Sequence, residues 1–309
     1  MTSAPHEYPE AAPGAERLDH FMARAAAAYY AAHDPFQDFA TSPEISQAFG
    51  ECLGLWAAVT WQAMGRPNPV LLVECGPGRG SLMADALRAI AEMMPDFRAA
   101  LRVHLVETSP RLRGTQAAKL GDAVAAWHAD VASLPEAPMI LLANEFLDAL
   151  PIRQFIHRAD GWRERHVLGG AFVELPSDIA LPKDAPEGAI QEVNEAAQHF
   201  AAWFGARLKR HGGAALLIDY GPAESGFGDS LQAMRAGQPV DPLVAPGAVD
   251  TVRGASAGSM PSTLADGGIP MRRRASVAEI ADVVRMLAGP EGGYITGQTI
   301  HVNGGAFLT

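Results

Sequence analysis

The chain has 309 residues, which is enough for one large hydrophobic core or two modest ones. Its 24 basic and 35 acidic side chains give a formal charge of −11, and this argues against nucleic-acid binding, which needs a basic face for the phosphates. With 48% apolar residues and a mean hydropathy of +0.02, the composition is that of a soluble globular protein, and no apolar run is long enough to span a membrane.

The N-terminal residues and the cysteines indicate a reducing compartment. Residues 1–16 are rich in Pro, Ala and Glu and lack both the apolar core of a signal peptide and the arginine bias of a transit peptide. Cys52 and Cys75 have no metal-ligand spacing and are expected to be reduced core thiols. We therefore expect a disordered tail over residues 1–16 and a cytoplasmic, bacterial-type location.

Two helices are predicted before the first strand. Arg17–His33 is alanine-rich, with apolar residues at helical spacing on one face: Leu18, Phe21, Met22, Ala25 and Tyr29. A second helix is expected to run to Met64, capped by Thr41 or Ser42 and with Glu44 near its positive end. Capping of the helix N-terminus is one explanation for these polar residues, and contact with a substrate is the alternative.

An apolar strand, a glycine turn and a helix follow one another over Val70–Met94. The run V-L-L-V-E-C-G-P-G-R-G places Glu74 at the end of the strand and Gly76, Gly78 and Gly80 in the turn. Glycines permit positive φ and close approach of the backbone to a ligand, and the N–H groups that open the helix can hold an anion. The turn lacks the lysine of G-x-x-x-x-G-K-[ST], which disfavours a nucleoside triphosphate. It predicts a cofactor-binding loop, the alternative being a simple tight connection.

Strands and helices continue to alternate along the next part of the chain. A helix at 110–120 lies between the first two of three further predicted strands, which are Leu101–Glu107, Val124–His128 and Met139–Ala143. This alternation predicts a parallel sheet with right-handed crossovers. Ligands of such sheets bind at the carboxyl ends of the strands.

Carboxylates follow three of these strands. Glu74 closes the first strand, Glu107 the second, and Asp130 follows the third. In a nucleoside site the carboxylate after the second strand accepts hydrogen bonds from the ribose hydroxyls, so Glu107 is predicted to bind ribose. Solvated strand caps are the alternative interpretation.

Further polar residues follow the fourth and fifth strands. Asn144, Glu145 and Asp148 come directly after the fourth strand, and a fifth core strand is predicted to end at Asp219, which Tyr220 follows. Two neighbouring carboxylates can bind a guanidinium through bidentate hydrogen bonds. A helix N-terminus with favourable acids is the alternative.

The remaining elements are a hairpin and a helix. Ile152–Ile156 and Arg163–Val167 are predicted to form a β-hairpin inserted after the fourth strand, and Glu187–Arg210 is predicted to be helical. Four histidines show no paired metal spacing and are interpreted as ordinary surface or packed residues: His33, His104, His128 and His199.

Five sequence runs together carry a family resemblance. They are D-F-A-T-S-P-E-I-S-Q (38–47), V-E-C-G-P-G-R-G-S-L-M-A-D (73–85), H-L-V-E-T-S-P (104–110), A-N-E-F-L-D-A-L-P-I-R-Q-F (143–155) and L-L-I-D-Y-G-P-A-E-S-G-F-G-D-S-L-Q (216–232). About residues 17–243 closely resemble the MidA family of class I S-adenosylmethionine-dependent methyltransferases, which includes a mitochondrial complex I assembly factor that methylates protein arginine.

The resemblance implies a Rossmann-like α/β fold, with a mostly parallel sheet and helices on both faces. It implies S-adenosyl-L-methionine held by the Gly76–Gly80 loop, with Glu107 on the ribose, Asp130 near the adenine, and Asn144 and Glu145 facing the acceptor. From the residues themselves we add Glu74 to the cofactor site and Asp148 to the catalytic group. Residues that we assign to substrate binding are Thr41, Ser42, Glu44, Asp219 and Tyr220.

The C-terminal segment departs from this family. After Asp241-Pro242-Leu243 the run V-A-P-G-A-V-D-T resembles a loop of short-chain dehydrogenases/reductases, and residues 270–309 resemble the end of that family. The chain therefore reads as a chimera joined near Ala245–Gly247, with a methyltransferase domain over 17–247 and a linker over 248–269. The tail is expected to supply a surrogate edge strand or an oligomer contact.

We predict a methyltransferase that needs no metal and acts on a protein or peptide with a cationic acceptor, most simply an arginine. A non-catalytic cofactor-binding or assembly module with an incomplete acceptor site is the alternative. A reductase fragment is disfavoured because the sequence has neither T-G-x-x-x-G-x-G nor Y-x-x-x-K.

Overall fold

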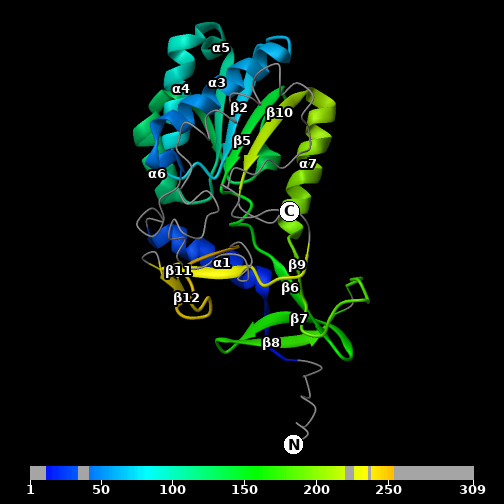
Figure 1. Ribbon diagram of the computed structural model, residues 1–309. Coiled ribbons are helices and arrows are strands. Elements are labelled where there is room, and N and C mark those ends of the chain that lie inside the picture. Colours follow the sequence, from blue (N-terminus) through cyan, green and yellow to red (C-terminus); the bar gives the residue numbers. More distant parts are fainter. Residues whose placement is uncertain (1–11, 34–41, 178, 220–225, 236–237, 254–309) are drawn as a thin grey trace, which may run out of the picture.

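The computed structural model describes residues 12–33, 42–177, 179–219, 226–235 and 238–253 (Figure 1). At its centre is a five-stranded sheet in the order β10–β5–β2–β3–β4. Its strands are β2 (Val70–Cys75), β3 (Leu101–Val106), β4 (Val124–His128), β5 (Met139–Asn144) and β10 (Gly213–Ile218). All neighbouring pairs are parallel, which confirms the predicted sheet and brings the carboxyl ends to one edge.

Helices cover both faces of this sheet, so its central strands are apolar throughout; all six residues of β2 are buried. One face carries four helices: α3 (Gln47–Ala63), α4 (Ser81–Met93), α5 (Pro95–Ala100) and α6 (Pro110–Leu120). The other face carries α7 (Glu195–His211), whose Phe200 packs against β2 and β5 (Figure 1). Short 3₁₀ turns, Gly121–Ala123 and Val131–Ser133, flank β4. Helices on both faces confirm the predicted class.

The predicted second helix is interrupted. Residues 42–45 form the four-residue helix α2 (Ser42–Ile45), and α3 starts anew at Gln47 because Ser46 is extended, with φ −147° and ψ 120°. Pro43 therefore opens α2 and not the long apolar helix. Helix α3 then packs closely on α4 at Gly50 and Gly54. A Cβ at either position would collide with atoms of α4, so the two helices can approach this closely only because these residues are glycines.

We expect Gly54→Ala to lower the free energy of unfolding by about 1–3 kcal/mol, because a Cβ there would lie 2.6 Å from the Ala86 carbonyl oxygen. Gly114→Ala is the matched control: Gly114 is exposed on α6 with open space around it, so alanine should add about 0.5–1 kcal/mol. Urea denaturation of both variants measures the difference. Equal stability of the two would contradict close α3–α4 packing.

A second, antiparallel sheet contains the predicted hairpin. Its strands are β1 (Glu16–Arg17), β6 (Arg153–Arg158), β7 (Gly161–Leu168), β8 (Ala171–Pro176) and β9 (Ile190–Val193). Strands β6 and β7 pair as predicted, through a tight turn at 159–160. Two predictions are wrong here. The stretch 187–210 is not helical throughout, because residues 190–193 pair with β6, and Glu16 of the expected tail pairs with β7.

Helix α1 (Leu18–Ala32) buries the five residues of its predicted apolar face. It runs beneath the carboxyl edge of the central sheet, with the Tyr30 carbonyl oxygen accepting a bond from Ser109 at the start of α6 (2.8 Å; Figure 1). Beside it lies a third sheet, made of β11 (Leu231–Arg235), β12 (Gln238–Val240) and β13 (Asp250–Arg253). The helix thus closes the site edge from below.

Part of the expected linker is folded. Strand β13 lies within 248–269 and pairs with β11, and Val249 is 1% exposed. The chain passes close to α1 at Gly247, where a Cβ would come within 2.7 Å of Ala28. Residues 254–309, including the reductase-like segment, lie outside the described part of the chain. None of the described helices has the length and hydropathy required to cross a membrane.

Candidate cofactor and acceptor site

The glycine turn has the geometry that its sequence predicts. Gly76, Gly78 and Gly80 have φ values of 65°, 53° and 77°, in the left-handed region that side chains disfavour. A Cβ on Gly76 would also lie 3.2 Å from the Phe146 ring, and one on Gly80 would lie 3.2 Å from Leu120. Helix α4 opens directly after the turn, at the carboxyl edge of the sheet. The positive φ values therefore favour glycine at all three positions, and close neighbours add to this preference at Gly76 and Gly80.

Glu74 is an isolated buried carboxyl group. It is 3% exposed, and its Oε2 has no hydrogen-bond partner among the described residues. Burial raises its pKa to about 8. Such a group is costly in the free protein and becomes favourable beside a cationic ligand.

Glu107 is also buried, at the end of β3. Its Oε1 accepts a bond from the backbone N–H of Ser109 (2.7 Å), and its Oε2 accepts one from the side-chain amide of Gln116 (3.3 Å). Burial raises its pKa, while these hydrogen bonds oppose the rise. Each oxygen keeps a second lone pair, so the carboxylate can still accept from a ligand's hydroxyl groups.

Gln116 links this carboxylate to the glycine turn, and the sequence analysis did not identify it. Its Nε2 donates to the Gly78 carbonyl oxygen (2.8 Å) as well as to Glu107, while its Oε1 accepts from the Trp127 indole (2.9 Å). The side chain is fully buried. A glutamine on a helix gives no sequence signal of such a role, because its three partners lie on other elements.

Asp130 lies at the same edge but is exposed. Its Oδ1 accepts from the Ala132 N–H (2.8 Å) and caps the 3₁₀ turn that follows β4. This matches the alternative interpretation of a strand-end cap. Its cofactor role stays a prediction.

The residues after β5 form a tight turn held by Asp219. Glu145 has φ 50°, an uncommon value for a residue with a side chain. The Asp219 Oδ2 accepts from the backbone N–H groups of Leu147 (2.6 Å) and Asp148 (3.1 Å). Asn144 donates to the Glu145 carboxylate at 3.4 Å. The structure thus brings Asn144, Glu145 and Asp148 together, with Asp219 bonded to the turn's backbone.

Glu44 lies against the cofactor loop. Its Oε1 accepts from the Ser81 hydroxyl (2.5 Å), Arg79 is 3.6 Å from its Oε2, and Lys119 donates to the same hydroxyl (2.6 Å). This contact ties α2 to the start of α4. Thr41 and Tyr220 lie outside the described residues, and Ser42 is described only through its backbone in α2.

Other titratable residues lie on the same strands: His128 ends β4, where its carbonyl oxygen accepts from the Glu107 N–H, and Cys75 ends β2. His104 and His128, interpreted as ordinary surface or packed residues, hydrogen-bond to each other (2.9 Å), and burial lowers the pKa of both. No group of three metal-ligating side chains occurs among the described residues. Cys75 is a buried free thiol as predicted, whereas Cys52 is only partly buried.

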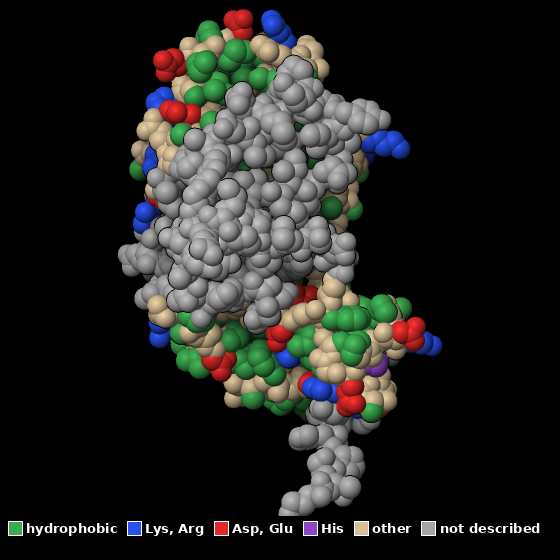
Figure 2. Space-filling view, viewed as in Figure 1, with side chains coloured by type: hydrophobic (Ala, Val, Ile, Leu, Met, Phe, Trp, Pro, Cys, Tyr) green, Lys and Arg blue, Asp and Glu red, His purple; other side chains and the backbone are tan. Residues whose placement is uncertain are grey.

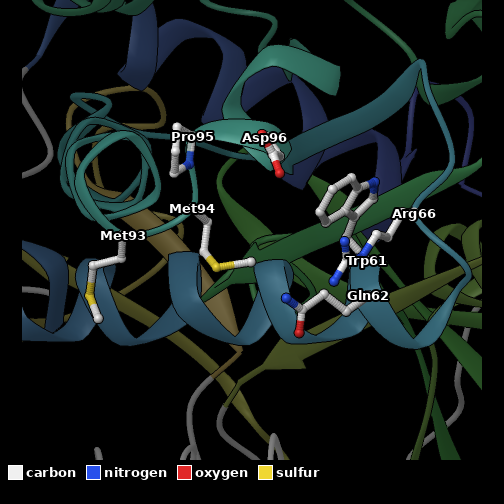
Figure 3. Close-up of a pocket in the computed structure, with 7 residues that line it drawn as sticks. All are labelled: Trp61, Gln62, Arg66, Met93, Met94, Pro95 and Asp96. Carbon is white, nitrogen blue, oxygen red and sulfur yellow. The ribbon is translucent and has the colours of Figure 1, made fainter.

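A small cavity of about 150 Å³ lies at the opposite end of the sheet, beyond the C-terminal ends of α3 and α4 (Figure 3). Its lining residues are Trp61, Gln62, Arg66, Met93, Met94, Pro95 and Asp96. On the face shown in Figure 2, the basic side chains of the described residues are scattered singly around the rim and form no basic patch. The carboxyl edge of the sheet therefore remains the candidate functional site.

A parallel sheet with a glycine turn after one strand and a buried carboxylate after the next is the arrangement of Rossmann-like folds that bind nucleoside cofactors. Residues 52–252 match the family described as "Putative S-adenosyl-L-methionine-dependent methyltransferase". The chain belongs to this family, as its motifs predicted. Residues 242–306 match a second family, described as "Enoyl-(Acyl carrier protein) reductase", which agrees with the resemblance of the tail.

Similar proteins support the same assignment. The chain is 34% identical to "Protein arginine methyltransferase NDUFAF7, mitochondrial" of Xenopus tropicalis, over 72% of this chain and 60% of the relative. It is 32% identical to the Drosophila melanogaster homologue, over 77% of this chain and 63% of the relative. A crystal structure of a Burkholderia thailandensis protein bound to S-adenosyl-homocysteine is 26% identical with a TM-score of 0.61, covering 79% of this chain and 70% of that one.

The chain thus spans less than two thirds of the length of these curated relatives. The match to the methyltransferase family ends at residue 252, and the match to the reductase family begins at residue 242. The two matches overlap where the sequence predicts the junction, near Ala245–Gly247.

Proposed function

We propose that this chain binds S-adenosyl-L-methionine at the glycine turn and transfers a methyl group to a protein arginine. The observation that carries the proposal is the left-handed turn at Gly76–Gly80, set beside the buried carboxylate of Glu107. The family description supports the cofactor, and the names of the relatives support arginine as the acceptor.

The residues present fit this cofactor. The positive φ values of Gly76 and Gly80 disfavour a side chain, and a Cβ there would lie only 3.2 Å from Phe146 or Leu120, which suits a loop whose backbone approaches a ligand. Glu107 offers free lone pairs for ribose hydroxyls, and the unpartnered Oε2 of Glu74 suits the ammonium end of an amino acid. When bound, the cofactor supplies a methyl group activated by a positively charged sulfur.

The protein's own contribution at the acceptor is positioning and charge. The turn after β5 carries Glu145 and Asp148, and two carboxylates can hold a planar guanidinium by paired hydrogen bonds. Asp219 fixes the backbone of this turn through two N–H groups. An oriented guanidinium whose proton is accepted by Glu145 becomes the nucleophile, and orientation supplies most of the rate gain.

A second candidate function is a cofactor-binding assembly module without transferase activity. It is favoured by one observation, that the chain leaves the methyltransferase family at residue 252 and spans only about 60% of the relatives. Cofactor binding without methyl incorporation into any protein would identify it.

Calorimetric titration of the full chain with S-adenosyl-homocysteine, with NADPH in parallel, tests the cofactor. Saturable binding of the first ligand alone is the expected result, and binding of NADPH alone would overturn the proposal. Incubation with cofactor labelled in the methyl group and arginine-containing protein extracts, followed by mass spectrometry of modified residues, then separates the two candidate functions.

We expect Glu145→Gln to lower methyl transfer about 100-fold, because an amide accepts no proton from the guanidinium. Affinity for S-adenosyl-homocysteine should remain at the wild-type value. Glu174→Gln is the control, since Glu174 pairs with Arg158 on the antiparallel sheet, away from the turn (2.5 Å). Full turnover in Glu145→Gln would remove the role that we assign to this carboxyl group.

A further inference from the structure

We propose that Gln116 is a positioning residue that fixes the cofactor loop and the ribose-binding carboxylate in one arrangement. The inference rests on the proposed function, because it concerns the same cofactor site. Gln116 is the described residue whose side chain bonds to both Gly78 of the loop and Glu107 of the next strand. Through these two bonds it spans the site from the glycine turn to the end of β3.

The hydrogen bonds define the orientation of the amide without ambiguity. A carbonyl oxygen and a carboxylate only accept, so the Nε2 of Gln116 must face Gly78 and Glu107. An indole nitrogen only donates, so the Oε1 must face Trp127. All three partners agree on one orientation, and the fully buried side chain has no solvent to exchange with.

The bond to Gly78 has a consequence for the loop. A peptide group is planar, so fixing the Gly78 carbonyl oxygen also fixes the direction of the Arg79 N–H, which points the opposite way. Glycine has wide conformational freedom, and backbone bonds hold the outer two glycines, from the Gly76 N–H to Val106 (3.0 Å) and from the Gly80 N–H to Pro77 (2.7 Å). Gln116 adds a side-chain bond at the middle glycine, which further restricts the loop before any ligand binds and lowers the entropic cost of binding.

The bond from Gln116 to Glu107 is complemented by a bond from Ser109, which precedes α6. The Ser109 N–H holds one carboxylate oxygen at 2.7 Å and Gln116 holds the other at 3.3 Å, so the carboxylate plane is fixed at both ends. Ser109 also caps α6 through its hydroxyl, which accepts from the Leu112 N–H (3.4 Å). Helix α6 therefore carries both the cap and the amide that orient Glu107.

Gln116→Leu tests the role by removing the amide at similar volume. We expect its dissociation constant for S-adenosyl-homocysteine to rise about 10-fold or more, because two site groups lose their donor. Trp127→Phe should give a smaller rise, since the amide remains but loses its anchor. Gln154→Leu is the matched control: Gln154 is also fully buried with three polar partners, Glu192, Asp229 and Arg165, in the antiparallel sheet. It should lose stability with unchanged affinity.

A fourth variant gives a readout that general destabilisation would not produce. In Gln116→Glu a carboxylate faces the Gly78 carbonyl and Glu107, and protonation restores one donor. The ratio of its dissociation constant to that of the wild type should therefore fall as the pH is lowered from 8 to 6. This arm also tests the inference if Gln116→Leu does not fold.

The outcomes separate the two proposals. If the wild type binds S-adenosyl-homocysteine and the folded Gln116 variants bind equally well, the inference is wrong and the proposed cofactor stands. A loss in Gln154→Leu as large as in Gln116→Leu would likewise overturn it. If the wild type binds no S-adenosyl-homocysteine, the proposed function fails and the inference with it.

Discussion

Replacing Glu107 with alanine is expected to raise the dissociation constant for S-adenosyl-homocysteine by about 100-fold or more. A ligand hydroxyl bonded to a buried carboxylate contributes about 1.5–3 kcal/mol, and a ribose offers two such hydroxyls. The substitution also leaves the Ser109 N–H and the Gln116 amide without their acceptor. Calorimetric titration of the folded variant measures the loss.

The control for this prediction is Glu174→Ala, which removes a partly buried glutamate and its pairing with Arg158 on the antiparallel sheet. Its affinity should equal that of the wild type. Wild-type affinity in a folded Glu107→Ala protein would show that the ribose is bound elsewhere, and the assignment of the carboxyl edge of β3 would then be wrong.

Glu74→Gln is expected to stabilise the protein at alkaline pH. Burial raises the pKa of Glu74 to about 8 in the folded chain, from an ordinary value of 4.5 for an exposed glutamate. Between these values the folded state holds a proton that the unfolded state releases, so the free energy of unfolding falls as the pH rises through this window. Glutamine does not ionise, so we expect it to gain about 2–4 kcal/mol over the wild type at pH 9 and little at pH 5.

Thermal unfolding of both proteins from pH 5 to pH 9 measures this effect, with the difference between them as the readout. Parallel curves would contradict a buried, unpartnered carboxyl group.

Binding adds a second test: the ammonium group of S-adenosyl-homocysteine beside Glu74 should favour the ionised carboxyl. Titrations in buffers of different ionisation heat should then show proton release near pH 7 in the wild type and less in Glu74→Gln.

Local sequence patterns predicted the elements of the central sheet well. Helix α6 has its predicted bounds, and the five apolar positions of α1 are all buried, because each pattern reflects burial of one helix face. The helix break at Ser46 was missed because the Ser, Pro and Glu residues before it favour a helix start whether the helix is short, like α2, or continues into α3. Strand β9 was missed because its four residues join a helical pattern, and only pairing with β6 makes them a strand.

The candidate site divides in a similar way. The turn at Gly76, Gly78 and Gly80 and the positions of Glu74 and Glu107 at strand ends could be predicted, because glycine favours positive φ and each acid directly ends an apolar run. Their roles in cofactor binding stay predictions. The structure changed the interpretation of two assigned residues. Glu44 bonds to Ser81 at the start of α4, and Asp219 accepts from the turn that carries Asp148. Both contacts join segments far apart in the sequence, which no local pattern encodes.

The sequence by itself determined the family, the parallel sheet and the left-handed glycine turn, because hydrophobic period and glycine spacing are local properties of the chain. Only the tertiary structure decided how the site is held. The bonds from Gln116 to Gly78, Glu107 and Trp127 join three separate elements, and the isolation of Glu74 depends on what surrounds it. Burial and partner choice arise when distant segments meet, and these two features set the charge and rigidity of the site.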